Sequence, residues 1–380
     1  MIVGCPKEAK PQEGRVGLLP WGVAELVRNG HTVLIQKGAG LAAGAADAQY
    51  VQAGAEIVDS PREIFGRADM IVKVKEPMPE EFIYFRSGQI VFTYFHFAAS
   101  RQLTEAMIQT QAVCIAYETV EEAGSVLALL EPMSEVAGRM AIQEGMHYLS
   151  SSTGGKGVLL GGVPGVPHGK VLIIGGGVVG LNAAKAAAGF GANVVIMDKS
   201  LPRLRYLDDI LPRNCTTRYS CEEVLKEELL TTDLVIGAVL LPGYRTPKIL
   251  RKDHLNLMKP GTVIVDVAVD HGGCCETSRM TYHEAPIYTV NNIVHYGVAN
   301  MPGAVPVTST TALTNATIPY IVQLANLGWR EACAKNKALR KGINILEGKV
   351  IHKGIGEAFD LPVFELRELP DGGLKPVLSA

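Results

Sequence analysis

A glycine-rich turn that joins an apolar strand to a helix constrains the fold of this chain more than any other feature. The strand is expected at Lys170–Ile174, an uninterrupted run typical of a strand buried in a parallel sheet. It leads directly into Gly175, Gly177 and Gly180, which have the GxGxxG spacing and open a helix. The next predicted strand ends in Asp198, roughly 20 positions after the turn. Strand, turn, helix and acid together form a complete dinucleotide-binding fingerprint, which predicts a Rossmann-type α/β domain.

Each residue of this fingerprint has a separate physical task. Gly175 permits the sharp turn, Gly177 lets a pyrophosphate approach the amides at the helix N-terminus, and Gly180 allows helix and strand to pack closely. Asp198 is expected to accept hydrogen bonds from the adenosine ribose and to repel a 2′-phosphate, so NAD is favoured over NADP. Arg203 lies near this acid in sequence and weakens that preference. The alternative interpretation is a glycine-rich turn that binds no ligand.

The alternation of strand-like and helix-like segments predicts two α/β domains. A chain of 380 residues exceeds the roughly 250 to 300 residues that one core usually serves. We expect a doubly wound, Rossmann-like NAD-binding domain over 131–304, introduced by a long helix, and a Rossmann-like substrate domain over 1–130. The tail 305–380 begins with another long helix and is too short for a domain, so it is expected to complete the first one, which is then discontinuous. The expected strands are 2–4, 31–36, 70–74, 89–93 and 113–116, then 170–174, 193–197, 234–236, 263–267 and 287–290.

Composition argues against several classes of partner. The 36 basic and 38 acidic side chains create no field that would gather nucleic acid or an anionic membrane. The seven cysteines are scattered without a CxxC pair, and the first eight residues lack the pattern of a secretory signal, so we expect a cytoplasmic protein with reduced thiols. The longest apolar run is short and broken by glycines, which argues against a membrane span.

A second group of polar residues lies where predicted strands of the first domain end. Arg15 follows a polar turn, Lys75 ends one strand and His96 comes just after another. Because the carboxyl ends of parallel strands meet at one edge of a sheet, Lys75 and His96 are expected to lie close together there. Lys73 competes with Lys75, since strand alternation puts both on the same face. Each of these residues also has an ordinary structural interpretation.

A third candidate is Asp270, which follows the predicted strand 263–267. An acid at a strand exit suits catalysis, and a helix cap or turn residue is the open alternative. Cys274 and Cys275 lie near His271, but no further ligands occur at zinc spacing, so no metal is expected.

Six short motifs carry a resemblance to a known family. They are Pro6-Lys-Glu8, Arg15-Val-Gly17, Val74-Lys-Glu-Pro77, Ala116-Tyr-Glu-Thr-Val120, Pro132-Met-Ser-Glu-Val-Ala-Gly138 and Asn300-Met-Pro302. With the dinucleotide fingerprint, they make the chain resemble the bacterial alanine dehydrogenases and their transhydrogenase relatives, from the first residue to about Trp329. The resemblance implies an NAD-dependent oxidoreductase that converts L-alanine reversibly to pyruvate and ammonium, usually as a homohexamer.

The resemblance also implies roles for individual residues. Arg15 would hold the substrate carboxylate and Lys75, rather than Lys73, would contact the substrate oxygens. His96 would be the acid/base, and Asp270 would assist proton transfer or orient the attacking water. Besides the glycines, the implied cofactor contacts are Ser134, Val178, Val179, Asp198, Arg203, Ser220, Val239, Leu240, Val267, Ala268, Val269, Asp270, Arg279, Val298, Ala299, Asn300 and Met301.

Three alternatives remain open within this interpretation: the NAD-binding subunit of a transhydrogenase, a non-catalytic NAD-binding protein, and a dehydrogenase for another amino acid such as lysine or glycine. Two positions depart from the expected family pattern. His271 stands where Gln is common, and Gly297 stands where Ala is usual.

Overall fold

The computed structural model describes residues 1–239, 246–368 and 374–378, and the chain divides into two compact units. The first unit combines Met1–Met133 with Gly303–Ala380, and the second is the continuous stretch Ser134–Pro302. Both are built on sheets of mainly parallel strands, so the predicted fold class is confirmed, including the discontinuous first domain. The boundaries expected after residues 130 and 304 lie within three residues of these limits.

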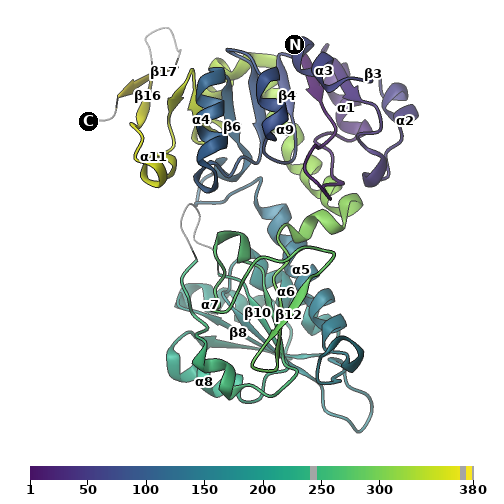
Figure 1. Cartoon of the computed structure of the whole chain (residues 1–380), viewed down its shortest axis with the longest axis vertical. Coiled ribbons are helices and arrows are strands. Elements are labelled where there is room, and N and C mark those ends of the chain that lie inside the picture. The colour runs from purple at the N-terminus through teal and green to yellow at the C-terminus, as the bar shows by residue number, and fades with distance from the viewer. Residues whose placement is uncertain (240–245, 369–373, 379–380) are drawn as a thin grey trace. The chain divides into compact units, whose positions relative to one another are not determined.

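The first unit is built on one large sheet with connecting helices. Its elements are β1 Ile2–Cys5, α1 Pro20–Arg28, β2 Thr32–Gln36, η1 Leu41–Ala43, α2 Asp47–Gln52, β3 Glu56–Val58, α3 Pro61–Arg67, β4 Met70–Val72, η2 Pro79–Tyr84, β5 Ile90–Thr93, η3 Phe97–Ala99, α4 Arg101–Thr110, β6 Val113–Ala116, η4 Tyr117–Thr119, α9 Pro306–Lys335, α10 Lys337–Gly342, β14 Ile343–Leu346, β15 Lys349–Val350, α11 Lys353–Phe359, β16 Phe364–Glu368 and β17 Leu374–Leu378. The sheet has eight strands in the order β15-β14-β6-β5-β4-β1-β2-β3 (Figure 1). Strands β1 to β6 are parallel, and antiparallel β14 extends the sheet beside β6.

Helices cover both faces of this sheet. On one face, α3 and α4 bring Phe65 and Met107 into a core with Val91 of β5. On the other, α1 packs on α9 so closely that a Cβ added at Gly22 would lie 2.5 Å from Ile318 Cδ1. The strand order reverses direction between β1 and β4, and α/β sheets bind ligands beyond the carboxyl ends of the strands at such a point.

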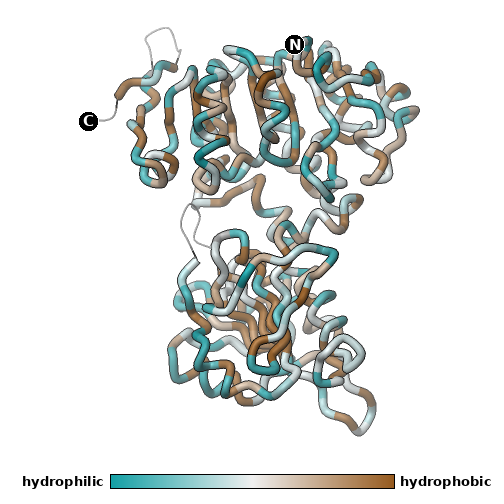
Figure 2. The backbone as a smooth tube through the Cα atoms, in the orientation of Figure 1, coloured by the Kyte–Doolittle hydropathy of each residue, from teal (hydrophilic) through white to brown (hydrophobic). Residues whose placement is uncertain are grey.

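The second unit has the strand order of a dinucleotide-binding fold. Its elements are α5 Glu131–Tyr148, which begins in the first unit, then η5 Ser151–Thr153, β7 Lys170–Ile174, α6 Val178–Gly189, β8 Asn193–Asp198, α7 Leu201–Ile210, β9 Cys215–Tyr219, α8 Glu222–Leu229, β10 Leu234–Gly237, η6 Asp253–Leu257, β11 Val263–Asp266, η7 Val269–His271, β12 Ile287–Val290, β13 Ile293–Tyr296 and η8 Met301–Ala304, which ends in the first unit. The order is β12-β13-β11-β10-β7-β8-β9, and only β12 is antiparallel. Figure 2 shows the sheet strands of this unit as its most hydrophobic segments. The direction reverses between β7 and β10, so the glycine-rich turn after β7 lies at the expected ligand position.

Several strands differ from the sequence prediction. Strands β3, β9 and β13 to β17 are not predicted, and the predicted strand 287–290 is the antiparallel edge strand β12. Strand β4 ends at Val72, before Lys73, so the strand alternation used to compare Lys73 with Lys75 does not extend to either residue. Within the described ranges, no helix is long and apolar enough to cross a membrane.

Candidate functional site

The glycine-rich turn after β7 has the geometry that its spacing predicts. Gly175 has a φ of +106°, in the left-handed region that favours glycine, and a Cβ added there would lie 2.6 Å from the Ala238 carbonyl oxygen. A Cβ on Gly180 would lie 1.9 Å from the Gly175 oxygen, so α6 and β7 could not pack with a larger residue. An added Cβ on Gly177 meets nothing within 4 Å. The N-terminus of α6 is therefore open on this side, where a pyrophosphate would approach.

Asp198 and Arg203 flank this turn. Asp198 ends β8, and its Oδ2 accepts a hydrogen bond from the Gly176 amide at 2.8 Å, while Oδ1 accepts one from the Ser200 amide at 2.8 Å. Arg203 Nε donates to the Gly176 carbonyl at 2.5 Å, and its guanidinium stacks over the Tyr206 ring. Asp198 and Arg203 are thus both hydrogen-bonded to the turn, Asp198 to the amide of Gly176 and Arg203 to its carbonyl oxygen.

Several of the other predicted cofactor residues follow parallel strands and so lie at the same edge of the second sheet. Ser220 follows β9, Val239 follows β10, Val267 to Asp270 follow β11, and Val298 to Met301 follow β13. Arg279 lies in the connection between β11 and β12 and stacks on the Tyr288 ring. Ser134 is the first residue of this unit, on α5. Leu240 lies outside the described residues.

The segment that carries Asp270 is anchored by a buried acid that the sequence analysis missed. Asp266 ends β11, and its Oδ1 accepts from the Ala268 amide at 3.2 Å. Its Oδ2 accepts from the Cys275 amide at 3.2 Å and from Ser278 Oγ at 2.5 Å. Asp270 Oδ2 accepts from the Asn300 amide at 3.4 Å. Two predicted cofactor segments of the second unit, 267–270 and 298–301, therefore meet at Asp270.

Arg15 is held by a neighbouring acid in the first unit. It lies after β1, is 2% exposed, and forms a two-point ion pair with Glu13, with Nε 2.7 Å from Oε1 and Nη2 2.6 Å from Oε2. Arg15 Nη1 lies 3.1 Å from Met133 Sδ. Burial opposes the charge of Arg15, but Glu13 more than compensates, so the pKa of Arg15 is raised. Glu13 thus fixes the plane of the guanidinium.

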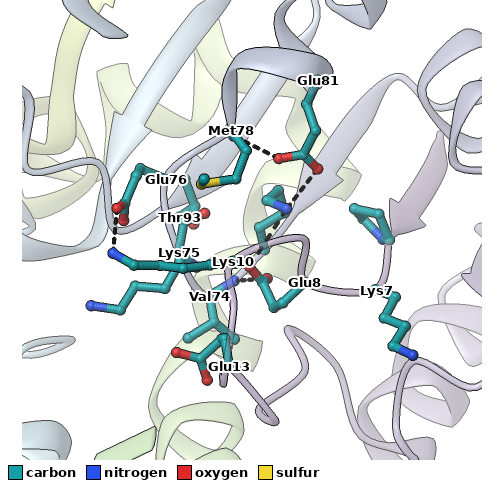
Figure 3. A network of polar contacts seen from close by, with 12 residues as sticks. Lys7, Glu8, Lys10, Glu13, Val74, Lys75, Glu76, Met78, Glu81 and Thr93 are labelled. Carbon is teal, nitrogen blue, oxygen red and sulfur yellow. Dashed lines mark hydrogen bonds and ion pairs between the residues drawn. The ribbon is translucent and has the colours of Figure 1, made fainter. Parts of the chain in front are cut away.

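Lys73 and Lys75 have clearly different surroundings. The fully buried Lys73 places Nζ 2.8 Å from Glu81 Oε1 and 3.5 Å from Glu8 Oε2. Lys75 Nζ points away from both carboxylates (Figure 3). The oxygen of the Lys75 peptide group accepts from Thr93 Oγ1 at 2.9 Å. Lys73 therefore forms internal ion pairs with Glu8 and Glu81, whereas the ammonium of Lys75 points away from these two carboxylates.

His96 occupies a constrained turn supported by Glu118. Its φ of +51° is unusual for a residue other than glycine, and its amide donates to Glu118 Oε1 at 2.6 Å. The Phe95 amide donates to the same carboxylate, and the His96 ring stacks on Tyr94 with centroids 5.9 Å apart. Burial raises the pKa of Glu118 to about 7, against the opposing effects of these amides and of Lys75.

Three predicted residues share one edge of the first sheet. Arg15 follows β1, Lys75 follows β4 and His96 follows β5, and these strands are neighbours. Glu118 lies in η4, directly after the next strand, β6. Asp270 belongs to the second unit. Among the described residues, no three His, Cys, Asp or Glu side chains are grouped so that they could hold a metal ion.

Comparison with protein families assigns both parts of the chain. Residues 4–137 match the model "Alanine dehydrogenase/PNT, N-terminal domain", and residues 141–353 match "Alanine dehydrogenase/PNT, C-terminal domain". The chain belongs to the alanine dehydrogenase/PNT family. The resemblance inferred from the short motifs is therefore confirmed.

Individual members of the alanine dehydrogenase/PNT family match over almost the whole chain. The "Alanine dehydrogenase" of Methanococcus maripaludis is 51% identical over 363 residues, which cover 95% of this chain and 97% of that protein. The "Alanine dehydrogenase" of Bacillus subtilis is 52% identical over 356 residues, or 93% and 94% of the two chains. A solved structure described as "L-alanine dehydrogenase" is 49% identical, with a TM-score of 0.91 over 95% of this chain and 99% of that one. A transhydrogenase from Sinorhizobium meliloti, at 23% identity and a TM-score of 0.78, shares the fold.

Proposed function

We propose that this chain catalyses the reversible, NAD-dependent oxidative deamination of L-alanine: L-alanine, NAD⁺ and water give pyruvate, ammonium, NADH and a proton. The observation that carries the proposal is the placement of Arg15, Lys75 and His96 beyond three neighbouring strands of one unit. The other unit of the same chain carries a dinucleotide fingerprint. A protein that only bound NAD would have no use for the first group. Relatives named alanine dehydrogenase, about half identical over nearly the full length, support the same conclusion.

The residues of the second unit fit NAD. Gly177 leaves the N-terminus of α6 open for the pyrophosphate, and the Asp198 carboxylate lies beside the turn for the adenosine ribose. The segments 267–270 and 298–301, with Ser134, Ser220, Val239, Leu240 and Arg279, would complete the binding surface. Acceptance of a hydride from the substrate carbon is the chemistry that bound NAD⁺ supplies.

The first unit would bind the substrate and exchange its protons. Arg15 presents a planar fork, oriented by Glu13, that suits a carboxylate. Lys75 would stabilise negative charge on the keto oxygen. His96 would move protons as water adds to the substrate iminium and ammonia leaves, because an imidazole changes charge near neutral pH. Asp270 would assist that proton transfer or orient the water.

The proposal also covers the oligomeric state, the cellular location and the binding partners of the enzyme. We propose a homohexamer in the cytoplasm that acts on the small molecules L-alanine, pyruvate and ammonium and binds neither nucleic acid nor membrane. The near balance of 36 basic and 38 acidic side chains argues against binding to nucleic acid or membrane, and the seven free cysteines are typical of a reducing compartment.

A spectrophotometric assay tests the proposal. Purified protein is mixed with NAD⁺ and one L-amino acid at a time, including alanine, glycine and lysine, and NADH absorbance is followed. We expect turnover with L-alanine, and NADH consumption with pyruvate plus ammonium. Failure of both reactions would reject the proposal. Turnover with only another amino acid would favour a related dehydrogenase, and hydride transfer between two nucleotides alone would favour a transhydrogenase subunit.

A further inference from the structure

A buried acid from the first motif of the chain contacts the backbone that carries Lys75. Glu8 is 8% exposed and lies 66 positions before Val74 in sequence. Its Oε1 accepts a hydrogen bond from the Val74 amide at 2.7 Å, and its Oε2 accepts one from the Lys75 amide at 3.3 Å (Figure 3). One carboxylate therefore holds two successive peptide groups. The motifs Pro6-Lys-Glu8 and Val74-Lys-Glu-Pro77 meet at this point.

Lys73 supplies the counter-ion that such a buried carboxylate needs. An ionised carboxylate loses several kcal/mol of hydration on burial unless it is paired and hydrogen-bonded. Lys73 Nζ lies 3.5 Å from Glu8 Oε2 and 2.8 Å from Glu81 Oε1. Glu81 Oε2 in turn accepts from the Met78 amide at 2.8 Å. The segment from residue 73 to residue 78 is thus tied down at both ends by the Lys73–Glu81 pair and in its middle by Glu8.

The peptide groups on both sides of the Lys75 Cα are restrained. The amide is held by Glu8, and the carbonyl accepts from Thr93 Oγ1 at 2.9 Å. Restraint of the backbone fixes the point from which the long, flexible Lys75 side chain extends, so its ammonium samples a smaller volume. A reacting geometry that is wrong by about 1 Å can cost about a hundredfold in rate.

We propose that Glu8 is a positioning residue for Lys75: its carboxylate fixes the peptide groups of Val74 and Lys75 and thereby sets where the Lys75 ammonium meets the substrate. The inference rests on the proposed function, in which Lys75 contacts the substrate oxygens. Lys73 and Glu81 balance the buried charge and hold the ends of the segment, away from the peptide groups of Lys75.

Two substitutions separate positioning from general stability. Glu8→Gln replaces one of the two acceptor oxygens by an NH₂ group that cannot accept from a backbone amide. Glu81→Gln is the matched control, because it also weakens an ion pair of Lys73 but leaves both oxygens of Glu8 in place. We expect Glu8→Gln to lower kcat/KM for pyruvate about ten- to hundredfold and Glu81→Gln to lower it less than about threefold. NADH binding should be unchanged in both.

Coupling to Lys75 is the decisive measurement. If Glu8 acts through Lys75, then Glu8→Gln should cause no further loss of kcat/KM in a Lys75→Ala chain. An equal loss in both backgrounds, or an equal loss in the Glu81→Gln control, would overturn the proposal.

Hydrogen–deuterium exchange gives a readout that needs no activity. The amides of Val74 and Lys75 should exchange at least about tenfold faster in Glu8→Gln than in Glu81→Gln, and equal rates would also count against the proposal. If Glu8→Gln alone does not fold, Glu8→Asp keeps the negative charge beside Lys73 but shortens the side chain by one methylene, and its amide exchange rates are compared with those of Glu81→Asp. Absence of wild-type turnover would overturn the proposed function, whereas the exchange rates test the backbone restraint independently.

Discussion

At the scale of single residues, His96 is the side chain whose removal should separate chemistry from cofactor binding. It lies in the first unit, whereas the dinucleotide fingerprint lies in the second. We expect His96→Ala to lower turnover about a hundredfold to ten-thousandfold, because positioned acid/base groups contribute that much. NADH binding, followed by its fluorescence, should persist. Loss of binding together with turnover would instead make His96 a structural residue.

Glu118 predicts a pH dependence of stability. Its pKa in the fold is about 7, raised by burial from an ordinary 4.5. Between these values the folded carboxyl keeps a proton that the unfolded one has lost, so its contribution is complete below pH 4.5 and falls as the pH rises through 7. Relative to Glu118→Gln, the wild-type free energy of unfolding should drop by on the order of 2 kcal/mol from pH 4.5 to pH 8. Denaturant titrations at several pH values would measure this difference, and parallel curves would contradict it.

Asp198 predicts the choice between nucleotides. Asp198→Ala removes a ribose acceptor and the repulsion of a 2′-phosphate, while Arg203 remains beside the turn. The preference for NADH over NADPH should therefore fall by roughly tenfold or more, as expected for loss of a hydrogen bond to a charged group. Fluorescence titrations with both nucleotides give the two dissociation constants. An unchanged ratio would show that the acid only shapes the turn through the Gly176 and Ser200 amides.

The sequence revealed residues that follow a local pattern, but it did not reveal residues that act through contacts distant in sequence. Gly175 to Gly180 and Asp198 follow a local spacing, and Arg15, Lys75 and His96 follow strand ends, so pattern and topology were enough to nominate them. Glu8 and Glu118 accept hydrogen bonds from the amides of Val74 and His96, which are distant in sequence. No local sequence pattern indicates these partners. The six motifs contained both acids but gave neither a task.

At the scale of elements, three of the strands that the sequence did not predict, β3, β9 and β13, lack a long run of hydrophobic residues. Strand β3 has three residues, and β9 contains Arg218 and has no fully buried position. Strand β13 is fully buried but includes His295, which is accommodated because Nε2 pairs with Thr277 Oγ1 at 2.7 Å and Nδ1 with the Ile293 carbonyl at 3.0 Å. Burial of a satisfied histidine depends on tertiary contacts, which local hydrophobicity does not report.

The bridge between Thr281 and Val298 brings Gly297 close to the backbone of Arg279. An added Cβ would lie 2.5 Å from the Arg279 carbonyl oxygen, a contact that the backbone must move to relieve. We expect Gly297→Ala to lower the free energy of unfolding by about 1 to 3 kcal/mol, as for overpacking elsewhere, and to weaken NADH binding through Arg279. Thermal melts and NADH titration measure the two effects. Unchanged values for both would mean that the loop relaxes freely.

At the scale of the whole molecule, the chain contains two doubly wound sheets, one proposed to bind the nucleotide and the other to bind the substrate. The second unit has the strand order and turn of a dinucleotide-binding fold, and the first carries Arg15, Lys75 and His96. Both architectures followed from alternating patterns in the sequence, and the return of the tail followed from its length. The antiparallel pairing of β14 with β6 could not be predicted, because it joins segments more than 200 residues apart.

That pairing also sets an order of events during synthesis. The ribosome releases β6 with an unpaired apolar edge, Val113–Ala116, and the whole second unit must emerge before Ile343–Leu346 can cover it. At typical elongation rates of about 5 to 20 residues per second, this edge waits for tens of seconds. An uncovered strand of this kind is a template for pairing with another nascent chain. The late arrival of β14 therefore leaves this apolar edge uncovered throughout the synthesis of the nucleotide-binding unit.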